Sequence, residues 1–335
     1  MNDKISVIIP CYNEEKYIKE CILSVLSQKK IHDLEIIVVD GSSTDNTKDI
    51  LNKLVNLYQD KEIIIVNNSQ RITPVALNLG INRSSGDYIC IMGAHAEYDD
   101  EFLSNCLILL KNPPEVSCAG GPILSKGKSN FAKAVAISMS SSIGVGNANH
   151  RFPEFEGYAE MACFPFFKRE VFDKYGLYDE SLVKNQDDEF CFRIRLKGEK
   201  IYISNKVKSA YYVKDSFSKL FSQYFSYGKW RIPVLLKHKI PISYRQQIPA
   251  LFFLTIVLLL IIALYFNNIY IALFLPVIYL IALFGFALIN FQKERFTVIK
   301  FIPLALFTLH FSYALGFISG IFKVGIDKIK RFVTK

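Results

Sequence analysis

The 335-residue chain is long enough for one large domain and an appendage. It is 51% hydrophobic and 14% aromatic, which is high for a wholly soluble protein, and its net charge of +9 favours anionic lipid or phosphate as a partner. No nucleic-acid partner is expected, because basic and aromatic residues do not alternate and no zinc-finger spacing occurs.

All seven cysteines lie within the first 191 residues, and no pair has C-x-x-C spacing. Their odd number and their spacing predict buried, reduced thiols in a cytosolic domain rather than disulfides or a metal site. The first residues run directly into a strand-like segment, so a signal peptide is not expected.

Short apolar runs alternate with helical patterns over the first two hundred residues. The predicted strands are 5–9, 35–39, 62–66 and 88–92. Because these runs lack polar alternation and are separated by helices, we expect an α/β domain with a mainly parallel sheet covered on both faces. Ligands of such sheets bind beyond the carboxyl ends of the strands.

Polar clusters follow the first two predicted strands and should face the same crevice. They are Pro10–Glu15 and Asp40–Asp45. Tyr12 can stack on a nucleotide base, and Asp40 can accept a hydrogen bond from uracil or from a ribose hydroxyl. Taken alone, an aspartate in this position is more often a residue that forms an Asx turn.

Three apolar segments follow residue 248. Residues 249–266 and 269–291 carry no charge, and 301–322 carries none apart from the weakly basic His310. Each is about long enough to cross the hydrocarbon core of a bilayer, which takes roughly 20 residues. Asn267–Asn268 predicts a tight turn that joins the first two segments as an antiparallel hairpin. Buried core helices are the less favoured alternative.

Basic residues near these segments indicate their orientation. The positive-inside rule places residues 237–245 in the cytoplasm together with Lys293, Arg295 and Lys300. If residues 301–322 also span the membrane, the basic tail ends outside, against the rule. Spanning is our expectation, with a re-entrant or interfacial placement as the alternative. The predicted parts are a catalytic domain at 1–235, an interfacial linker at 236–248, transmembrane helices at 249–322 and a basic tail at 323–335.

Three motifs stand together in the first part of the chain: S-V-I-I-P-C-Y-N-E-E, E-I-I-V-V-D-G-S-S-T-D-N-T and S-G-D-Y-I. In combination they resemble the family-2 glycosyltransferases of the GT-A fold, over roughly residues 4–235. The resemblance implies an inverting enzyme of the hexosyltransferase class that uses nucleotide-diphospho-sugars. The chain is most similar to the succinoglycan-type glucosyltransferase subgroup, on the cues at 93–96, 185–190 and 223–230.

The resemblance also implies a set of residues that contact the nucleotide-sugar donor, with UDP as the favoured nucleotide. The stretch Arg71–Gly80 looks like the segment that lies under the nucleotide. The implied donor-binding residues are Pro10, Tyr12, Asn13, Glu14, Asp40, Ser42, Arg71, Asn78 and Ala94.

After the fourth strand the resemblance implies Asp-x-Asp or Asp-x-His, which holds metal and donor, but this chain has Gly93-Ala94-His95. His95 stands where the metal-contacting residue is expected, and imidazole is a suitable ligand for Mn²⁺. A divalent cation, Mn²⁺ or Mg²⁺, is therefore implied. Gly93 replaces the first carboxylate and leaves metal dependence open, with Glu97 as a candidate to compensate.

Within Gln186-Asp187-Asp188-Glu189, the resemblance aligns Asp187 with the catalytic carboxylate that acts as general base. Acidic residues in the first turn of a helix also suit its macrodipole, and the two interpretations are compatible. The residues implied on the acceptor side are Phe164, Glu189 and Trp230. Trp230 equally fits an amphipathic interfacial helix.

The sequence thus predicts a multi-pass protein of the inner membrane with a cytoplasmic catalytic domain. It would transfer a sugar from a nucleotide sugar to a lipid-linked saccharide in surface polysaccharide biosynthesis. Transfer onto polyprenyl phosphate and a catalytically silent nucleotide-sugar binder are the alternatives. A nicotinamide dehydrogenase is excluded, since no G-x-G-x-x-G follows the first strand, and the apolar segments lack the carboxylate or lysine of a transporter.

Overall fold

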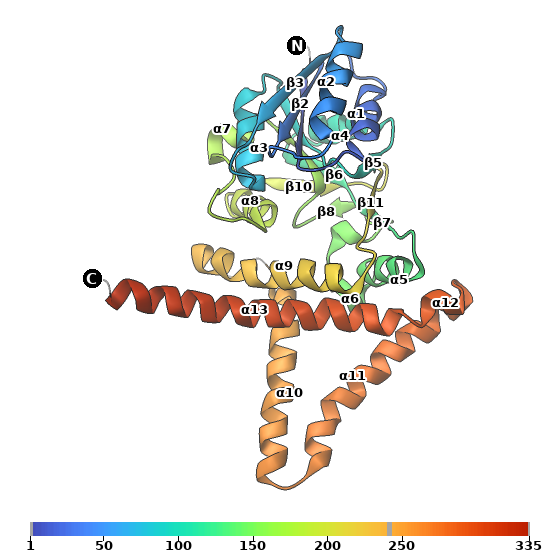
Figure 1. Ribbon diagram of the computed structural model, residues 1–335, viewed down its shortest axis with the longest axis vertical. Helices are drawn as coiled ribbons and strands as arrows, with labels where there is room; N and C mark the ends of the chain where they lie inside the picture. The colour runs from blue at the N-terminus through green and yellow to red at the C-terminus, as the bar shows by residue number, and fades with distance from the viewer. Residues whose placement is uncertain (1–2, 240–242, 334–335) are drawn as a thin grey trace. The chain divides into compact units, whose positions relative to one another are not determined.

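The computed structural model describes residues 3–239 and 243–333, which divide into two compact units (Figure 1). The first unit holds the chain up to Leu124 together with Ala148–Tyr212, and the second holds Ser125–Asn147 and the chain from Val213 onward. Contacts rather than sequence order define these units, so residues 213–235 belong with the apolar helices. The domain boundaries predicted from the sequence stay a prediction.

An eight-stranded sheet, in the order β3-β2-β1-β4-β9-β6-β10-β8, forms the centre of the first unit. Its strands are β1 (Ile5–Cys11), β2 (Leu34–Asp40), β3 (Glu62–Asn67), β4 (Tyr88–Ile91), β6 (Val116–Gly121), β8 (Gly157–Tyr158), β9 (Cys163–Lys168) and β10 (Lys200–Ile203). The four predicted strands are confirmed as β1 to β4, which pair in parallel with β1 between β2 and β4. β9 runs antiparallel to both β4 and β6, so the other half of the sheet is mixed.

Six α-helices accompany this sheet in the described part of the first unit. They are α1 (Ile18–Leu26), α2 (Thr47–Leu57), α3 (Thr73–Arg83), α4 (Phe102–Lys111), α7 (Glu170–Tyr175) and α8 (Gln186–Arg195). A short strand, β5 (Ala96–Tyr98), pairs antiparallel with β11 (Ser209–Tyr212). β7 (Ile123–Lys126) leads the chain from the first unit into the second.

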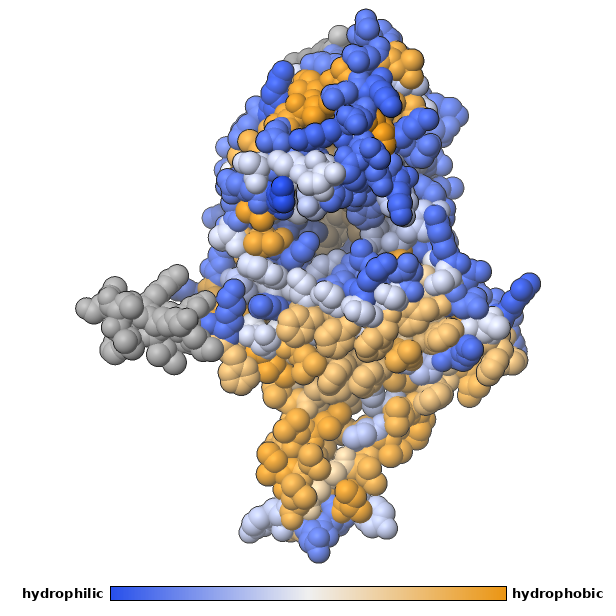
Figure 2. Space-filling model, viewed as in Figure 1, coloured by the Kyte–Doolittle hydropathy of each residue, from blue (hydrophilic) through white to orange (hydrophobic). Residues whose placement is uncertain are grey.

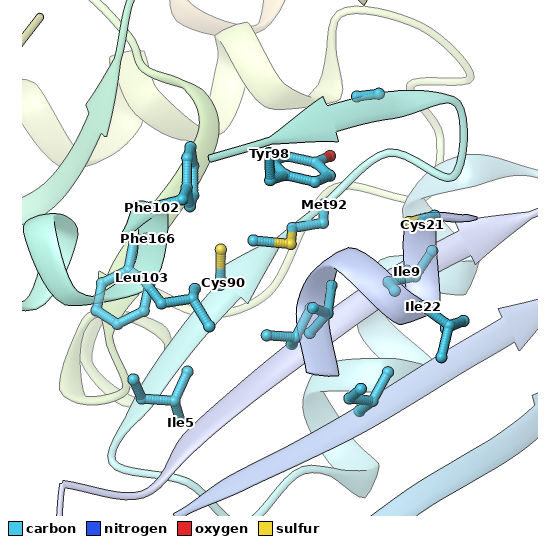
Figure 3. Packing of buried hydrophobic residues seen from close by; sticks show 14 of the residues in the cluster. Ile5, Ile9, Cys21, Ile22, Cys90, Met92, Tyr98, Phe102, Leu103 and Phe166 are labelled. Carbon is cyan, nitrogen blue, oxygen red and sulfur yellow. The ribbon is translucent and has the colours of Figure 1, made fainter. Parts of the chain in front are cut away.

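Hydrophobic cores lie on both faces of the sheet, because successive side chains of a strand point to opposite sides. Ile9 of β1 packs in the core that α1, α2 and α4 cover, together with Ile22 and Phe102 (Figure 3). Its neighbour Ile8 packs in the opposite core, which α3, α7 and α8 cover and which contains Phe190. The predicted two-sided covering is confirmed. All seven cysteines are free thiols, as expected, and six of them are buried.

The buried carboxylate of Glu35 ties together the beginnings of β1, β2 and β4. It accepts hydrogen bonds from the hydroxyl of Ser6 and from the backbone N–H groups of Ser85 (2.6 Å) and Gly86 (3.1 Å). A Cβ on Gly86 would lie 2.6 Å from the Ser6 hydroxyl, so this close approach requires the glycine. Burial pushes the pKa of Glu35 upward, but the hydrogen bonds from Ser6 and Ser85 and the charge of Lys4 outweigh it and lower the pKa.

The second unit is helical. Its α-helices are α5 (Asn130–Met139), α6 (Ser142–Val145), α9 (Phe217–His238), α10 (Ile248–Tyr265), α11 (Ile269–Ile289), α12 (Phe296–Ile299) and α13 (Ile302–Val333). In the described residues, three segments are long and apolar enough to cross a membrane, in agreement with the prediction: Ile248–Tyr265, Ile269–Gln292 and Phe296–Val324.

α10 and α11 form the predicted hairpin. Asn267 has a φ of 48° in the turn, and the side chain of Asn268 accepts a hydrogen bond from the N–H of Tyr270 at the start of α11. The hairpin extends away from α9 and α13 (Figure 1), and its surface is hydrophobic except at the polar tip (Figure 2).

α13 differs from this hairpin because it lies along α9 (Figure 1). A Cβ on Gly316 would collide with the carbonyl oxygen of Phe225, and one on Gly228 with that of Tyr313, so the two backbones are in direct contact. Half of the apolar window of α13 is buried inside the protein, against 11% for α10 and 17% for α11. Contact with protein, rather than with lipid, therefore accounts for much of its apolar surface.

His310 of α13 connects three parts of the second unit. Its Nε2 lies 2.9 Å from the carbonyl oxygen of Ile143, and its Nδ1 lies 2.8 Å from the hydroxyl of Tyr279 in α11. A neutral ring that donates from Nε2 and accepts at Nδ1 satisfies both contacts. The polar residue noted in this apolar segment is thus a structural cross-link.

Candidate active site

The loops that follow β1 and β2 are joined by hydrogen bonds. The N–H of Asn13 donates to the hydroxyl of Ser43 (2.9 Å), and the side-chain oxygen of Asn13 accepts from the N–H of Thr44 (2.8 Å). The N–H of Glu14 donates to the hydroxyl of Thr47 (2.8 Å). The two polar clusters predicted from the sequence therefore form one continuous edge beyond the carboxyl ends of parallel strands.

Asp40 is fixed at the end of β2. Its side chain is 1% exposed, and it accepts hydrogen bonds from the N–H (3.1 Å) and hydroxyl groups of Ser43. The ammonium group of Lys48 lies 3.7 Å from its carboxylate. Next to it, Ser42 has a φ of 57° and donates a hydrogen bond to the side chain of Asn67 (3.0 Å). The Asp40 carboxylate thus closes the turn over residues 40–43, at the strand end where the donor interpretation requires it.

Tyr12 and Arg71 come together from different loops. The Tyr12 ring is 46% exposed, and the guanidinium carbon of Arg71 lies 5.5 Å from its centroid, which is within range for a cation–π contact. A Cβ on Gly41 would lie 3.2 Å from the Cβ of Tyr12, so the glycine makes room for this residue. Pro10 precedes the loop and pairs with Val39 of β2. The arrangement offers an aromatic face and a positive charge to a ligand.

His95 lies in the connection between β4 and β5 and faces the loop that follows β1. Its Nδ1 is 3.1 Å from a carboxylate oxygen of Glu14, and its ring centroid is 5.8 Å from that of Tyr211. The side chains of His95 and Glu14 are 41% and 20% exposed. Ala94, by contrast, is buried in the core. The structure therefore pairs two predicted site residues that lie far apart in the sequence.

The hydroxyl of Tyr98 holds Gly93 by both of its backbone polar groups. It accepts from the Gly93 N–H (2.6 Å) and donates to the Gly93 carbonyl oxygen (3.1 Å). The ring of Phe164 packs edge-on against that of Tyr98, with centroids 5.0 Å apart, and lies beside Gly93. Glu97 accepts a hydrogen bond from the hydroxyl of Tyr212 (2.7 Å) on β11. Of the two carboxylates considered near His95, Glu14 is the one in contact with it.

A divalent cation fits this site with few protein ligands. Within residues 3–239 and 243–333, no three His, Cys, Asp or Glu side chains are grouped so as to hold a metal ion. Glu14 and His95 offer one carboxylate and one imidazole, which are donor types that suit Mn²⁺. A cation bound here would take its remaining ligands from phosphate oxygens and water, as is usual at nucleotide sites.

Asp187 lies in the first turn of α8 and is exposed to solvent. Its carboxylate accepts a hydrogen bond from the N–H of Asp188 (2.9 Å). Glu189, one residue further on, is fully buried and forms two hydrogen bonds with the guanidinium of Arg193 (3.2 and 3.3 Å). Of these carboxylates, Asp187 is the accessible one, and the predicted acceptor role of Glu189 stays a prediction.

The negative charge of Asp187 affects the thiol of Cys163 at the beginning of β9. Burial raises the pKa of the Cys163 thiol to about 11, Arg151 opposes the shift, and the charges of Asp187 and Asp188 add to it. Cys163 directly precedes Phe164 in the chain. Arg151 and Tyr98 were not predicted from the sequence, because neither stands in a motif or directly follows a predicted strand of the parallel sheet.

Two predicted residues have contacts of another kind. Asn78 accepts a hydrogen bond from the N–H of Tyr178 (3.0 Å) and donates to the Tyr178 carbonyl oxygen (2.9 Å) and to Glu180 (2.9 Å). It thus holds a backbone segment beside α3. Trp230 lies on α9 in the second unit, where the ammonium group of Lys323 is 5.7 Å from its ring. Their donor and acceptor roles stay predictions.

Curated relatives are similar to most of the chain. The succinoglycan biosynthesis protein ExoA of Rhizobium meliloti (strain 1021) is 30% identical over 247 residues, which cover 72% of this chain and 73% of the relative. A Methanococcus voltae protein named dolichyl N-acetyl-alpha-D-glucosaminyl phosphate 3-beta-D-2,3-diacetamido-2,3-dideoxy-beta-D-glucuronosyltransferase is 28% identical over 325 residues. That match covers 95% of this chain and 97% of the relative.

The fold is also found among solved structures. The mannosyltransferase PcManGT of Pyrobaculum calidifontis, solved in complex with GDP-Man and Mn²⁺, superposes with a TM-score of 0.65 at 18% identity. The superposition covers 92% of this chain and 86% of that protein, which shows a shared GT-A-type fold. The model of glycosyl transferase family 2 matches residues 6–176, about half of the chain and most of the sheet described above. The chain therefore belongs to glycosyl transferase family 2 and is a glycosyltransferase.

Proposed function

We propose that the protein is an inverting transferase that moves a sugar from a nucleotide-diphospho-sugar, a UDP-sugar in the first instance, to a hydroxyl of a lipid-linked saccharide. The observation that carries the proposal is the common edge formed by the loops after β1 and β2, which carries the exposed Tyr12, the Glu14–His95 pair and the buried Asp40. Ligands of parallel α/β sheets bind at such an edge.

The donor would lie along this edge with its base against Tyr12. Arg71, 5.5 Å from the Tyr12 ring, supplies a positive charge for the base or the phosphates. Asp40 is 1% exposed and bound to Ser43, so it would accept hydrogen bonds from the base or the ribose only after the donor displaces Ser43. A divalent cation, when bound, neutralises charge on the diphosphate as it leaves. The solved relative contains GDP-Man, so GDP-sugars are the second donor class to test.

Asp187 would act as the general base. As the acceptor oxygen attacks the anomeric carbon, the carboxylate takes the proton of the acceptor hydroxyl, and the bond from that carbon to the phosphate oxygen breaks on the opposite face. One new glycosidic bond forms, the configuration inverts, and the nucleoside diphosphate departs. The exposure of Asp187 supports this role, because a base must reach a substrate hydroxyl.

The apolar helices support an acceptor at the membrane. Three of the described segments are long enough to cross it. One relative is named for succinoglycan biosynthesis, and the name of another includes a dolichyl-linked sugar phosphate. We place the protein in the inner membrane as a multi-pass protein with a cytoplasmic catalytic unit, which fits the positive-inside rule at residues 237–245. The product would be a longer lipid-linked saccharide for a surface polysaccharide.

The test uses the full chain in detergent with UDP- and GDP-sugars, Mn²⁺, Mg²⁺ or EDTA, and lipid-linked saccharide or polyprenyl phosphate as acceptors. One donor should be consumed in proportion to glycosylated acceptor. Asp187→Asn should lower kcat by about 10² to 10⁴-fold, because general-base catalysis supplies that much. Asp188→Asn, in the same helical turn, is the matched control and should retain turnover.

The other outcomes separate the alternatives. Product on polyprenyl phosphate alone would replace the saccharide acceptor with the lipid phosphate. Tight donor binding without turnover under every condition would identify a silent nucleotide-sugar binder. Equal loss in Asp187→Asn and Asp188→Asn would remove Asp187 as the base.

A further inference from the structure

A histidine that binds a cation is commonly oriented by a carboxylate, and the structure limits where that carboxylate can come from. Gly93 offers none, and its backbone is held by the Tyr98 hydroxyl on both sides. Glu97 is hydrogen-bonded to Tyr212 on β11. Glu14 is the carboxylate that contacts His95, at 3.1 Å from Nδ1.

The Glu14 backbone is held firmly while its side chain reaches His95. Its N–H donates to the Thr47 hydroxyl (2.8 Å), and its carbonyl oxygen accepts from the N–H groups of Tyr17 and Ile18, both at 2.9 Å. The β1 loop therefore fixes the origin of the carboxylate. A side chain that orients a neighbouring residue must itself extend from a fixed backbone, and Glu14 meets this condition.

The contact also selects one form of the imidazole. A carboxylate has no proton to give, so Nδ1 of His95 is the donor, and in the neutral ring the remaining lone pair lies on Nε2. The His95 side chain is 41% exposed, which leaves room for a ligand. Metal-binding histidines in proteins commonly donate their other N–H to a carboxylate in this way, which orients the ring and makes it a better ligand.

We propose that Glu14 is a positioning residue that holds His95 with Nε2 directed to a divalent cation, and that Nε2 of His95 is the principal protein ligand. Position 93 has no carboxylate, and the chain instead places the Glu14 carboxylate behind the His95 ring. Glu14 then serves the cation rather than the nucleotide directly. The inference rests on the proposed nucleotide-sugar transfer and specifies how the same site binds its metal.

The test measures metal binding and not turnover. Mn²⁺ is titrated into the full chain in detergent, alone and with UDP, and the Kd follows from the EPR signal of free Mn²⁺. Pulsed EPR of protein labelled with ¹⁵N-histidine then detects any imidazole bound to the ion. The chain has five histidines, so the His95→Gln variant assigns the signal.

The wild-type protein should show ¹⁵N coupling that His95→Gln abolishes. Glu14→Ala should weaken Mn²⁺ binding by about 10 to 100-fold and keep the coupling, because loss of such outer contacts has effects of this size. Glu14→Gln should recover part of the affinity, since its amide oxygen still accepts from Nδ1. Glu15→Ala is the matched control, because Glu15 contacts Asn46 instead of His95, and its Kd should not change.

Three results would overturn the inference: no histidine coupling in the wild-type protein, an unchanged Kd in Glu14→Ala, or an additional bound water in that variant. The additional water, counted by deuterium coupling in ²H₂O, would make Glu14 a direct ligand. Mn²⁺ held by His95 in a protein that transfers no sugar would refute the proposed function alone. Sugar transfer in EDTA without histidine coupling would refute this inference alone.

Discussion

The ring of Phe164 occupies the space that a side chain on Gly93 would enter. A Cβ on Gly93 would lie 3.1 Å from Cε1 and 3.8 Å from Cζ of that ring. Phe164 reaches this place with a φ of 49°, a backbone region that residues with side chains seldom adopt. The missing carboxylate at position 93 is thus matched by an aromatic ring in its place.

Gly93→Asp alone should therefore not improve Mn²⁺ binding, because the Phe164 ring excludes the new carboxylate from a productive position. Gly93→Asp combined with Phe164→Gly frees the space, and glycine tolerates the positive φ at position 164. The double variant should bind Mn²⁺ about tenfold more tightly, a gain of about 1.4 kcal/mol. EPR titration measures both Kd values.

Phe164→Gly alone is the control and should leave the Mn²⁺ affinity at the wild-type value. If Gly93→Asp alone gained as much affinity as the double variant, the ring would not be the obstacle.

Glu35→Gln should destabilise the first unit by about 1 to 3 kcal/mol at pH 7, because it weakens acceptance from Ser6, Ser85 and Gly86 in a buried network. The folded-state pKa of Glu35 is lowered, so its stabilisation is fully present above the unfolded pKa of about 4.5 and is lost as the pH falls through the folded pKa. The difference in Tm between wild type and variant should therefore shrink below about pH 4.5.

Glu62→Gln provides the comparison, since that exposed carboxylate contacts Lys4 but lies outside the network. Its effect on Tm should be small at every pH. A Glu35→Gln difference that grew on acidification would contradict the lowered pKa.

The sheet was the most predictable part of the fold, because four uninterrupted apolar runs separated by helical spacing allow few arrangements. The runs at 5–9, 35–39, 62–66 and 88–92 became β1 to β4, with the expected parallel pairing. The placement of β9 between β4 and β6 was not predictable, since an antiparallel return is set by long-range packing and not by a local pattern.

The part of the site that depends on residues close together in the sequence was predictable. The two loop clusters met because parallel strands end at one edge, but the Glu14–His95 contact joins residues 81 positions apart. Phe164 beside Gly93 depends on an unusual backbone angle at position 164, which no sequence period signals. The sequence alone shows that Gly93 departs from the motif. Only the three-dimensional packing shows that the Phe164 ring lies where a side chain at position 93 would extend.

Lys323→Cys should be labelled by a membrane-impermeant maleimide from the same side as Lys237→Cys. The sequence favours a third span, but α13 lies along α9, whose sequence includes Lys229 and Arg231. If α13 crossed the bilayer, α9 would be drawn in with it, and a charge at the bilayer centre costs about 2.5 to 3.5 kcal/mol or more. We therefore expect α13 to lie at the interface, with α10 and α11 as the spanning hairpin.

Asn267→Cys, at the tip of that hairpin, should be labelled from the opposite side in intact and inverted vesicles. Background labelling should be low, because six of the seven native cysteines are buried. Lys323→Cys labelled together with Asn267→Cys would instead establish the third span.

Gly316→Ala tests the contact between α9 and α13 directly. The new Cβ collides with the backbone carbonyl oxygen of Phe225, which no side-chain rotation relieves, so the helices must separate. Forced overpacking of this kind costs about 1 to 3 kcal/mol, and the Tm of the second unit should fall accordingly. Gly285→Ala in α11 is the matched control, since no atom lies within 4 Å of its added Cβ, and the substitution should leave Tm unchanged or raise it slightly through better helix propensity. Equal Tm values for the two variants would mean that α13 does not pack on α9 through this glycine.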